Sequence, residues 1–426
     1  MAVGQTKLTA TQSRLETLSL PRCGWTLARR SEAKNRVISM GLPVRRDEYW
    51  KFTRPDELTS ATVMNAKPLA DDNALIFSKL DCLSIVFEDG VFNAQKSDKF
   101  DRDEVTLELL SQVNELDIHW AADLYGAIEA KGQTPVSRPL AALNTAFASE
   151  GLLVHVKGAL SKPISLIYLQ NSDCADVTLH HVIKVDEGAS ATVLESGAVG
   201  ARSNIVIEAD IKDGARLNHV RVQGRNPERR AVTHLFAQLN QESHLKSFTL
   251  TMNGVLTRNE AFIEICGDDS VAHIAGASAG DGAFHHDDTV FINHNALRGE
   301  SRQVFKKVLR NAAIGVFQGK ILVQAGAQKT DGYQISQSLL LDDNSQFLAK
   351  PELEIYADDV VCSHGSTSGA IDEEAIFYLT SRGITKVDAK NILTLAFLAE
   401  ALSEVGDEII ADIIERLLED WLSGRL

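Results

Sequence analysis

The sequence has few residues that would support a disulfide-stabilised fold, a structural zinc site or a membrane span. Its five cysteines are scattered over 426 residues without a CxxC pair, which favours free, reduced thiols. No apolar run approaches the roughly 20 residues that cross a bilayer, so we expect no membrane segment. Basic residues are outnumbered 43 to 58 by acidic ones. The resulting net charge of −15 argues against a protein that binds nucleic-acid phosphates.

Motifs for nucleotide binding and for zinc-dependent hydrolysis are also absent from the sequence. It contains neither GxxxxGK[ST] nor a GxGxxG between a strand and a helix, and it lacks HExxH. We therefore expect neither ATP hydrolysis nor dinucleotide binding by a known loop. The first thirty residues lack the apolar core of a secretory signal, and their five basic residues give only a weak similarity to a transit peptide. A cytoplasmic location is the resulting expectation.

The first 139 residues form a mainly helical N-terminal region by pattern. Residues 26–40 are rich in helix formers and stop before Gly41 and Pro43. Residues 85–92 are typical of a β-hairpin around an Asp-Gly turn, and residues 104–130 again suggest helix.

Residues 140–370 carry short β-branched stretches that alternate with turns. An acidic residue, a small residue and an alternating strand recur after Glu187, Asp213, Glu242 and Asp269, at spacings of 26, 29 and 27 residues. A further match follows at Asp343. Repeats of this length indicate a solenoid whose coils stack on one another. A β-sandwich with regular turns is the alternative.

Residues 371–426 predict a C-terminal helical domain of three helices. Asp372 and Thr385 stand at cap positions, and residues 410–422 place apolar side chains at spacings of three and four. The segment has 12 acidic and 5 basic residues. It is either a solvated cap on the solenoid or a docking surface for a partner.

The most histidine-rich part of the chain is His285-His286-Asp287-Asp288, followed by His294. Adjacent residues of a strand point to opposite faces, so one metal could collect only half of this group. Buried or turn-capping histidines are therefore favoured over a local metal site.

A second candidate site is Cys362-Ser-His364, within a stretch rich in Ser and Gly. On an extended chain the thiol and the imidazole share one face, and both are ligands suited to iron or an iron–sulfur cluster. Two ligands do not complete a tetrahedral site. A structural cysteine with a histidine that shapes the turn is the alternative.

The same stretch resembles a known family. Residues 351–384, 301–309 and 317–334 resemble the SufB/SufD family of iron–sulfur cluster assembly scaffolds, and residues 41–53 and 142–151 resemble its SufD branch. The resemblance implies a right-handed parallel β-helix over residues 140–370, with helical regions before and after it. It also implies a non-catalytic subunit that pairs with SufB and with the ABC-type ATPase SufC, which would dock on residues 371–426.

By the same resemblance, Cys362 and His364 are candidate interface residues near a nascent cluster. Iron or the cluster would be transient and shared with the partner subunit, and none would be held tightly by the isolated chain. A homodimer of the isolated chain is a further possibility. The resemblance gives no role to His285, His286 or His294. A carbohydrate-active β-helix lyase or hydrolase is the alternative from another functional class.

Overall fold

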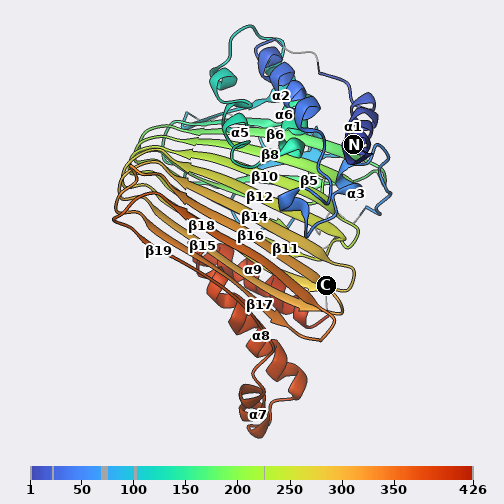
Figure 1. Ribbon diagram of the computed structural model, residues 1–426, viewed down its shortest axis with the longest axis vertical. Helices are drawn as coiled ribbons and strands as arrows, with labels where there is room; N and C mark the ends of the chain where they lie inside the picture. The colour runs from blue at the N-terminus through green and yellow to red at the C-terminus, as the bar shows by residue number, and fades with distance from the viewer. Residues whose placement is uncertain (1, 22–23, 69–74, 100–102, 225, 425–426) are drawn as a thin grey trace.

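The computed structural model describes residues 2–21, 24–68, 75–99, 103–224 and 226–424, which leaves Cys23 outside the described residues. Two long, mainly parallel sheets dominate the molecule, with helices before and after them in the chain (Figure 1). The predicted class, a mainly β solenoid with helical flanks, is confirmed. Cys82, Cys174, Cys266 and Cys362 are free thiols, as expected.

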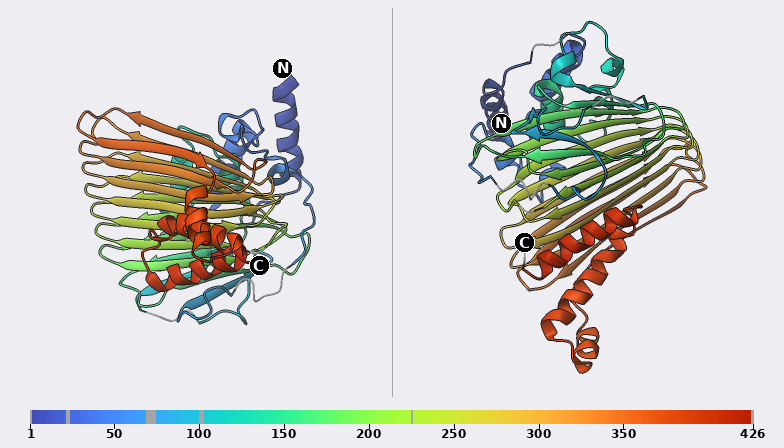
Figure 2. Two further views of the ribbon diagram at one scale, coloured as in Figure 1. Left: turned by 90° about the horizontal axis from the view of Figure 1, so that it is seen from below. Right: turned by 180° about the vertical axis from the view of Figure 1, so that it is seen from behind.

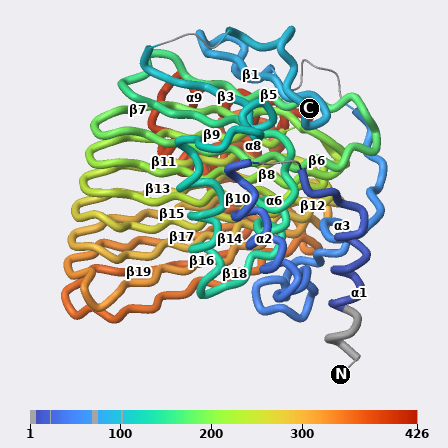
Figure 3. Tube along the Cα trace, turned by 90° about the horizontal axis from the view of Figure 1, so that it is seen from above, coloured from blue at the N-terminus to red at the C-terminus, as the bar shows by residue number. Residues whose placement is uncertain are grey.

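Successive strands of the solenoid alternate between the two sheets, and Figure 3 follows the stacked coils along the chain. The ten-stranded sheet contains β5 (Ile164–Leu169), β7 (Ser190–Gly197), β9 (Arg216–Gln223), β11 (His244–Met252), β13 (Val271–Asp281), β15 (Glu300–Arg310), β17 (Asp331–Leu340) and β19 (Val361–Gly369). The nine-stranded sheet contains β4 (Leu152–Val156), β6 (Asp176–Val185), β8 (Arg202–Ile211), β10 (Arg230–Leu239), β12 (Leu256–Ile265), β14 (His285–His294), β16 (Ile314–Val323) and β18 (Gln346–Ile355). Each of these strands pairs in parallel with the strand one coil away, which is the pairing of a parallel β-helix.

The sequence repeat corresponds to the turns that precede strands of the ten-stranded sheet. Gly188, Gly214, Glu242 and Asp269 occupy the same place in successive turns, and their φ angles lie between 54° and 67°. Glycine adopts this left-handed conformation without steric cost, which explains its place in two of the four turns. The expected further match at Asp343 is wrong. That residue lies in the turn before β18, which belongs to the other sheet.

Inward-facing side chains stack from coil to coil to form an aliphatic core. One row places Ile183, Ala209, Ala237, Ile263 and Ile292 opposite one another on five consecutive strands. All five are almost fully buried. Complete burial of a large aliphatic side chain stabilises the folded state by about 1.5–3 kcal/mol, so each such row holds its coils together.

A second inward-facing row is polar. The Glu195 carboxylate accepts hydrogen bonds from Tyr168 Oη at 2.8 Å and pairs with His219 Nε2 at 3.0 Å. It also contacts the Arg221 guanidinium, which in turn donates to Thr233 Oγ1 at 2.9 Å. These side chains come from four successive or neighbouring strands. Charged groups inside the solenoid are therefore paired between coils rather than exposed to water.

The C-terminal helices are capped as the sequence predicts. They are α7 (Glu373–Ser381), α8 (Lys386–Leu402) and α9 (Glu408–Leu422). The Asp372 side chain accepts the N–H of Glu374, and the Thr385 hydroxyl accepts the N–H of Asp388. These caps satisfy N–H groups that have no partner within the helix.

Helices α8 and α9 lie on the outer face of the ten-stranded sheet (Figure 2). Leu398, Ile414 and Trp421 are buried there against strand residues such as Val220 and Phe248. A cap on the end of the solenoid does not describe these helices, because they cover its side.

Ion pairs join the same helices to the sheet. Glu404 pairs with His273 at 3.2 Å and with Arg302 at 2.7 Å, and Lys306 contacts Glu400. Apolar packing and ion pairs together thus fix the helices to the solenoid.

The N-terminal residues form a second helical layer on the nine-stranded sheet, at the top of Figure 1. Its elements are α1 (Ala2–Glu16), α2 (Leu27–Met40), η1 (Glu48–Trp50), α3 (Asp56–Thr59), α4 (Leu110–Val113), η3 (Trp120–Asp123), α5 (Ala127–Lys131) and α6 (Pro139–Phe147). Three strands accompany them: β1 (Leu83–Glu88), β2 (Val91–Phe92) and β3 (Val105–Leu109). The predicted hairpin is confirmed, because β1 and β2 pair antiparallel.

Part of this N-terminal region joins the solenoid. β1 pairs in parallel with β5, and β3 pairs antiparallel with β4. The expectation of helix throughout residues 104–130 is therefore wrong, because Val105, Leu107 and Leu109 alternate inward as a strand before α4 begins. The division of the chain at residues 139 and 370 stays a prediction.

Candidate functional site at the open end of the solenoid

The solenoid ends at two strands that each have one neighbour among the described strands. β18 pairs only with β16, and β19 only with β17. The N–H of Val361 donates to the carbonyl of Thr330, in the loop that enters β17. Alternate residues of a parallel strand point their polar groups to opposite sides, so the N–H groups of residues 362, 364, 366 and 368 face the free edge. Such an edge is a template for pairing with another chain.

Cys362 and His364, the residues singled out in the sequence, lie on this edge strand. They share one face of β19, as predicted, and stand opposite Gly332 and Gln334 of β17. Cys362 is half-buried near Ile321, an inward-facing residue, whereas His364 is exposed. The thiol and the imidazole therefore both belong to the inner face of the last coil, at its mouth.

The local environment keeps the Cys362 thiol protonated. Burial raises its pKa, and the Asp331 carboxylate adds to the effect. Gly332 leaves room for the sulfur, because a Cβ at that position would lie 3.1 Å from Sγ. Since the thiolate is the form that binds metals, a cation brought to the site would have to displace the thiol proton.

These two side chains supply only part of a metal site. The described residues contain no group of three or more His, Cys, Asp and Glu side chains arranged to hold a metal ion. A tetrahedral iron–sulfur centre takes four protein or sulfide ligands. Any centre at Cys362 and His364 would therefore need ligands from a second chain.

The histidine-rich segment on β14 divides between the two faces of the sheet, as predicted. On the outer face, His285 Nε2 lies 3.0 Å from Thr53 Oγ1, and Asp287 pairs with Arg258 at 2.5 Å. Burial lowers the pKa of His285. The contact with Thr53 attaches the N-terminal layer to the sheet, whereas the Arg258–Asp287 pair joins β12 to β14.

The other half of the segment faces the interior. His286 Nε2 lies 3.1 Å from Asn259 Nδ2, and Asp288 pairs with Lys307 at 2.5 Å. At the end of the strand, His294 Nε2 lies 2.8 Å from Ser301 Oγ, and burial lowers the His294 pKa to about 4. All of these groups have partners within the fold.

A third feature, the exposed aromatic face of α7, was not predicted from the sequence. The helix projects beyond the solenoid at the bottom of Figure 1. Its Phe377 and Tyr378 are 74% and 55% exposed. They line an open hollow of about 880 Å³ together with Asp372, Glu373, Glu374 and Ile392. The adjacent aromatic residues Phe377 and Tyr378 were the signal that the sequence offered for this surface.

None of the described helices has the length and apolar content needed to span a membrane.

Comparison with known proteins places these features in one family. The SUF system FeS cluster assembly, SufBD core domain matches residues 168–397. The chain is 30% identical to the iron–sulfur cluster assembly protein SufD of Escherichia coli, over 89% of this chain and 90% of that protein. It is 26% identical to a SufBD family protein of Synechocystis over 88% and 87% of the two chains. Identity to SufD of Bacillus subtilis is 25% over 66% of each chain. The chain therefore belongs to the SufB/SufD family of SUF iron–sulfur cluster assembly proteins, and within it is most like SufD.

Proposed function

We propose that this chain is a scaffold subunit of the SUF iron–sulfur cluster assembly complex, without catalytic turnover of its own. It pairs with a SufB-like subunit and a SufC-like ABC ATPase in the cytoplasm and supports iron acquisition and cluster assembly. Iron or the nascent cluster is the cargo, held transiently and shared with the partner. Family membership leaves the carbohydrate-active alternative without support.

The observation that carries this proposal is the position of Cys362 and His364 on an edge strand that pairs with β17 on one side only. A partner strand added beside β19 would bring its own side chains next to the thiol and the imidazole. The partner can then complete a coordination that two ligands leave open. An isolated chain would lose iron to water and chelators, which agrees with a transient cargo.

The partner ATPase is proposed to dock on the C-terminal helices. Phe377 and Tyr378 give α7 an exposed aromatic surface of the kind that anchors protein interfaces. The acidic residues beside them would favour a basic counterpart and speed association at low salt. Helices α8 and α9 are occupied with packing against the sheet, so α7 is the part left for a partner.

The test of the cluster role is His364→Ala in the complete complex, with iron and sulfide content measured after anaerobic reconstitution. We expect an intact complex with iron content reduced severalfold, because one ligand or near-ligand is lost.

Thr367→Ala is the matched control, because Thr367 lies on the same strand but on its opposite face. It should leave both assembly and iron content unchanged. If His364→Ala complexes carry normal iron and mature target proteins normally, the proposed role of His364 is wrong. Loss of assembly would instead assign the residue to the interface.

A further inference from the structure

The outer face of the ten-stranded sheet extends beyond the helices that cover it. Figure 2 shows α8 and α9 crossing only part of this face. They pack on its apolar part, where Val220 and Phe248 lie further along β9 and β11. The beginnings of these two strands carry Arg216, His244 and Lys246 on the same outer face. Arg216 is exposed and the other two are half-buried.

The register of the strands brings these three residues, the basic triad, close together. Arg216 and His244 are directly opposite on β9 and β11, and adjacent strands lie about 4.7–4.9 Å apart. Lys246 follows on the same face, about 7 Å further along β11. A Cβ on Gly406, in the connection between α8 and α9, would lie 3.3 Å from Lys246 Cδ. The connection therefore confines the lysine stem at the border of the helical layer.

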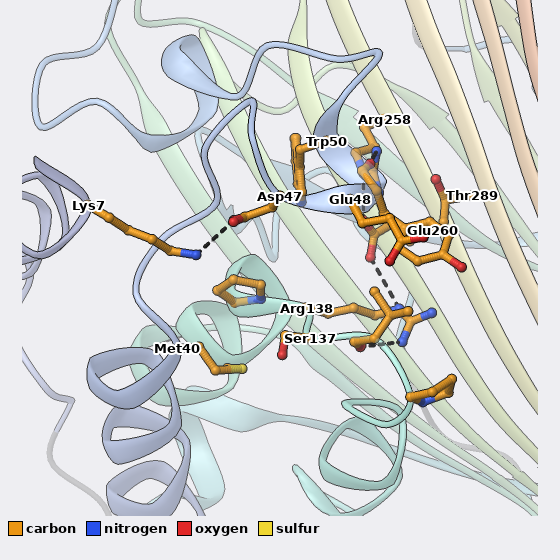
Figure 4. Close-up of a pocket in the computed structure, with 14 residues that line it drawn as sticks. Lys7, Met40, Asp47, Glu48, Trp50, Ser137, Arg138, Arg258, Glu260 and Thr289 are labelled. Atoms are coloured by element: carbon orange, nitrogen blue, oxygen red, sulfur yellow. Dashed lines mark hydrogen bonds and ion pairs between the residues drawn. The ribbon is translucent and has the colours of Figure 1, made fainter. Parts of the chain in front are cut away.

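The basic triad lacks the acidic partners that other cations of this protein have. In the cavity of Figure 4, between the N-terminal layer and the nine-stranded sheet, Arg138 pairs with Glu260 at 3.4 Å and Lys7 with Asp47 at 2.8 Å. No side chain of the basic triad takes part in an ion pair or a hydrogen bond within the part of the chain that the structure describes. The triad is thus an unneutralised basic surface on a chain whose net charge is −15.

The same two residue types hold a carboxylate two strands away in the same sheet. His273 and Arg302 are directly opposite on β13 and β15, as the histidine and the arginine of the triad are on β11 and β9. The Glu404 carboxylate, from the connection between α8 and α9, lies 3.2 Å from His273 Nδ1 and 2.7 Å from Arg302 Nε. The fold itself supplies the acid at this second pair, whereas the basic triad has none.

We propose that the basic triad docks an acidic segment of a partner protein, whose Glu or Asp carboxylates bind as Glu404 binds to His273 and Arg302. Arg216 and Lys246 donate charge-assisted hydrogen bonds to them, and the protonated His244 donates a third. A protein segment fits this open face better than a small metabolite, which needs a pocket that buries most of its surface. The triad is separate from the edge of β19 and from α7, so binding here is independent of the cluster and ATPase roles proposed above.

The direct test is an NMR titration of the full-length chain, labelled at histidine, with an acetylated and amidated tetraglutamate peptide. The imidazole signal of His244 is the one that is missing from His244→Gln. We expect this signal to shift with a Kd below about 1 mM at low salt, and the Kd to rise at least about fivefold in about 0.2 M NaCl. No shift of the His244 signal at about 10 mM peptide overturns the proposal.

Binding should also change the protonation of His244. In the free chain, burial is the main cause that lowers its pKa, followed by the nearby positive charges. The charged groups around it are Arg216 of β9, Lys246 of β11, His273 of β13 and Glu300 of β15, with Glu404 beyond His273. Carboxylates of the peptide favour the protonated imidazole, so the peptide should raise the pKa of His244 and bind more tightly as the pH falls from about 8 to about 6. An unchanged or lowered pKa in the presence of peptide overturns the proposal.

Variants locate the binding. Arg216→Gln combined with Lys246→Gln removes two cations without partners in the fold, so the melting temperature should stay the same while the peptide Kd rises at least about tenfold. Lys386→Gln combined with Lys390→Gln removes the same charge from exposed positions of α8 and should leave the Kd unchanged. Equal Kd values for the two double variants overturn the proposal. If inorganic phosphate shifts the His244 signal as strongly as the peptide at equal concentration, the triad is a general anion site, and docking of an acidic protein segment is likewise overturned.

Discussion

Buried histidines make the stability of this protein depend on pH. Burial lowers the pKa of His294 and of His181 to about 4, whereas the ordinary histidine pKa is about 6.5. Between these pH values the two imidazoles are protonated in the unfolded chain but neutral in the folded chain. The free energy of unfolding therefore falls as the pH falls from 6.5 to 4. At a pH below both pKa values, a shift of this size lowers the free energy of unfolding by on the order of 3 kcal/mol per residue.

We therefore expect the free energy of unfolding, measured in urea, to decrease between pH 7 and pH 5. His294→Asn should make the free energy of unfolding less dependent on pH over this range, because the variant lacks one imidazole that is protonated only in the unfolded chain. An unchanged slope would contradict the assignment.

His273 gives the opposite contrast. The hydrogen bond between His273 and Glu404 is the main cause of the raised pKa of His273. His273 therefore adds its full share to the free energy of unfolding below pH 6.5, and this share is lost as the pH rises through the pKa of the folded state. His273→Gln should flatten the alkaline side of the same curve and leave the acid side as it is.

At the scale of single elements, the free edge of β19 can be tested without touching the metal-binding side chains. Ser366→Pro removes an N–H that faces the open edge, so the β17 ladder keeps its bonds while a partner strand loses one. We expect normal folding by circular dichroism but weakened pairing with a SufB-like subunit, and less of any homodimer in the isolated chain, measured by light scattering.

Ser366→Ala is the control, because both variants lose the hydroxyl contact with Ser336 but only proline loses the N–H. Equal pairing of the two variants would mean that the partner does not bind by strand addition at this edge.

Helix α7 can be separated experimentally from the other C-terminal helices. Phe377→Ala combined with Tyr378→Ala should abolish co-purification with the ATPase and leave the melting temperature nearly unchanged, because both side chains are exposed. Ile118→Ala, at an exposed apolar residue of the N-terminal region, is the control. Retained ATPase binding in the double variant would exclude α7 as the docking site.

Deletion of residues 371–426 is a poorer test. It would uncover the apolar outer face on which Leu398 and Trp421 pack, so loss of binding could follow from misfolding alone.

The sequence predicted local features of these elements better than their placement. The caps at Asp372 and Thr385, and the shared face of Cys362 and His364, follow from rules about neighbouring residues, and all are present. The packing of α9 on the side of the solenoid depends on contacts between residues more than 100 positions apart, such as Trp421 and Arg310, whose guanidinium carbon lies 4.3 Å from the centre of the indole ring. No local pattern contains that information. Asp343 was misassigned because the turns of the two sheets use the same residue types.

The whole molecule has an unequal distribution of neighbours along its axis. Each coil contacts mainly the coils on either side, as in other repeat proteins, and β19 has a coil on one side only. In hydrogen-exchange mass spectrometry we expect amides of β19 to exchange faster than those of β11 and β12. Addition of a SufB-like partner should protect β19 selectively. Equal protection of all the strands would contradict this gradient.

The polar row inside the solenoid has a consequence for how its sequence can change. Two identical aliphatic coils could be exchanged, duplicated or stacked in a different order with little loss of folding stability. Glu195 and Arg221, however, are partners one coil apart. A coil inserted between β7 and β9 would leave both charges buried without their partner, at a cost of about 3–5 kcal/mol. The order and number of coils at this point are thus specified by charge pairing, and duplication of a repeat here would be selected against.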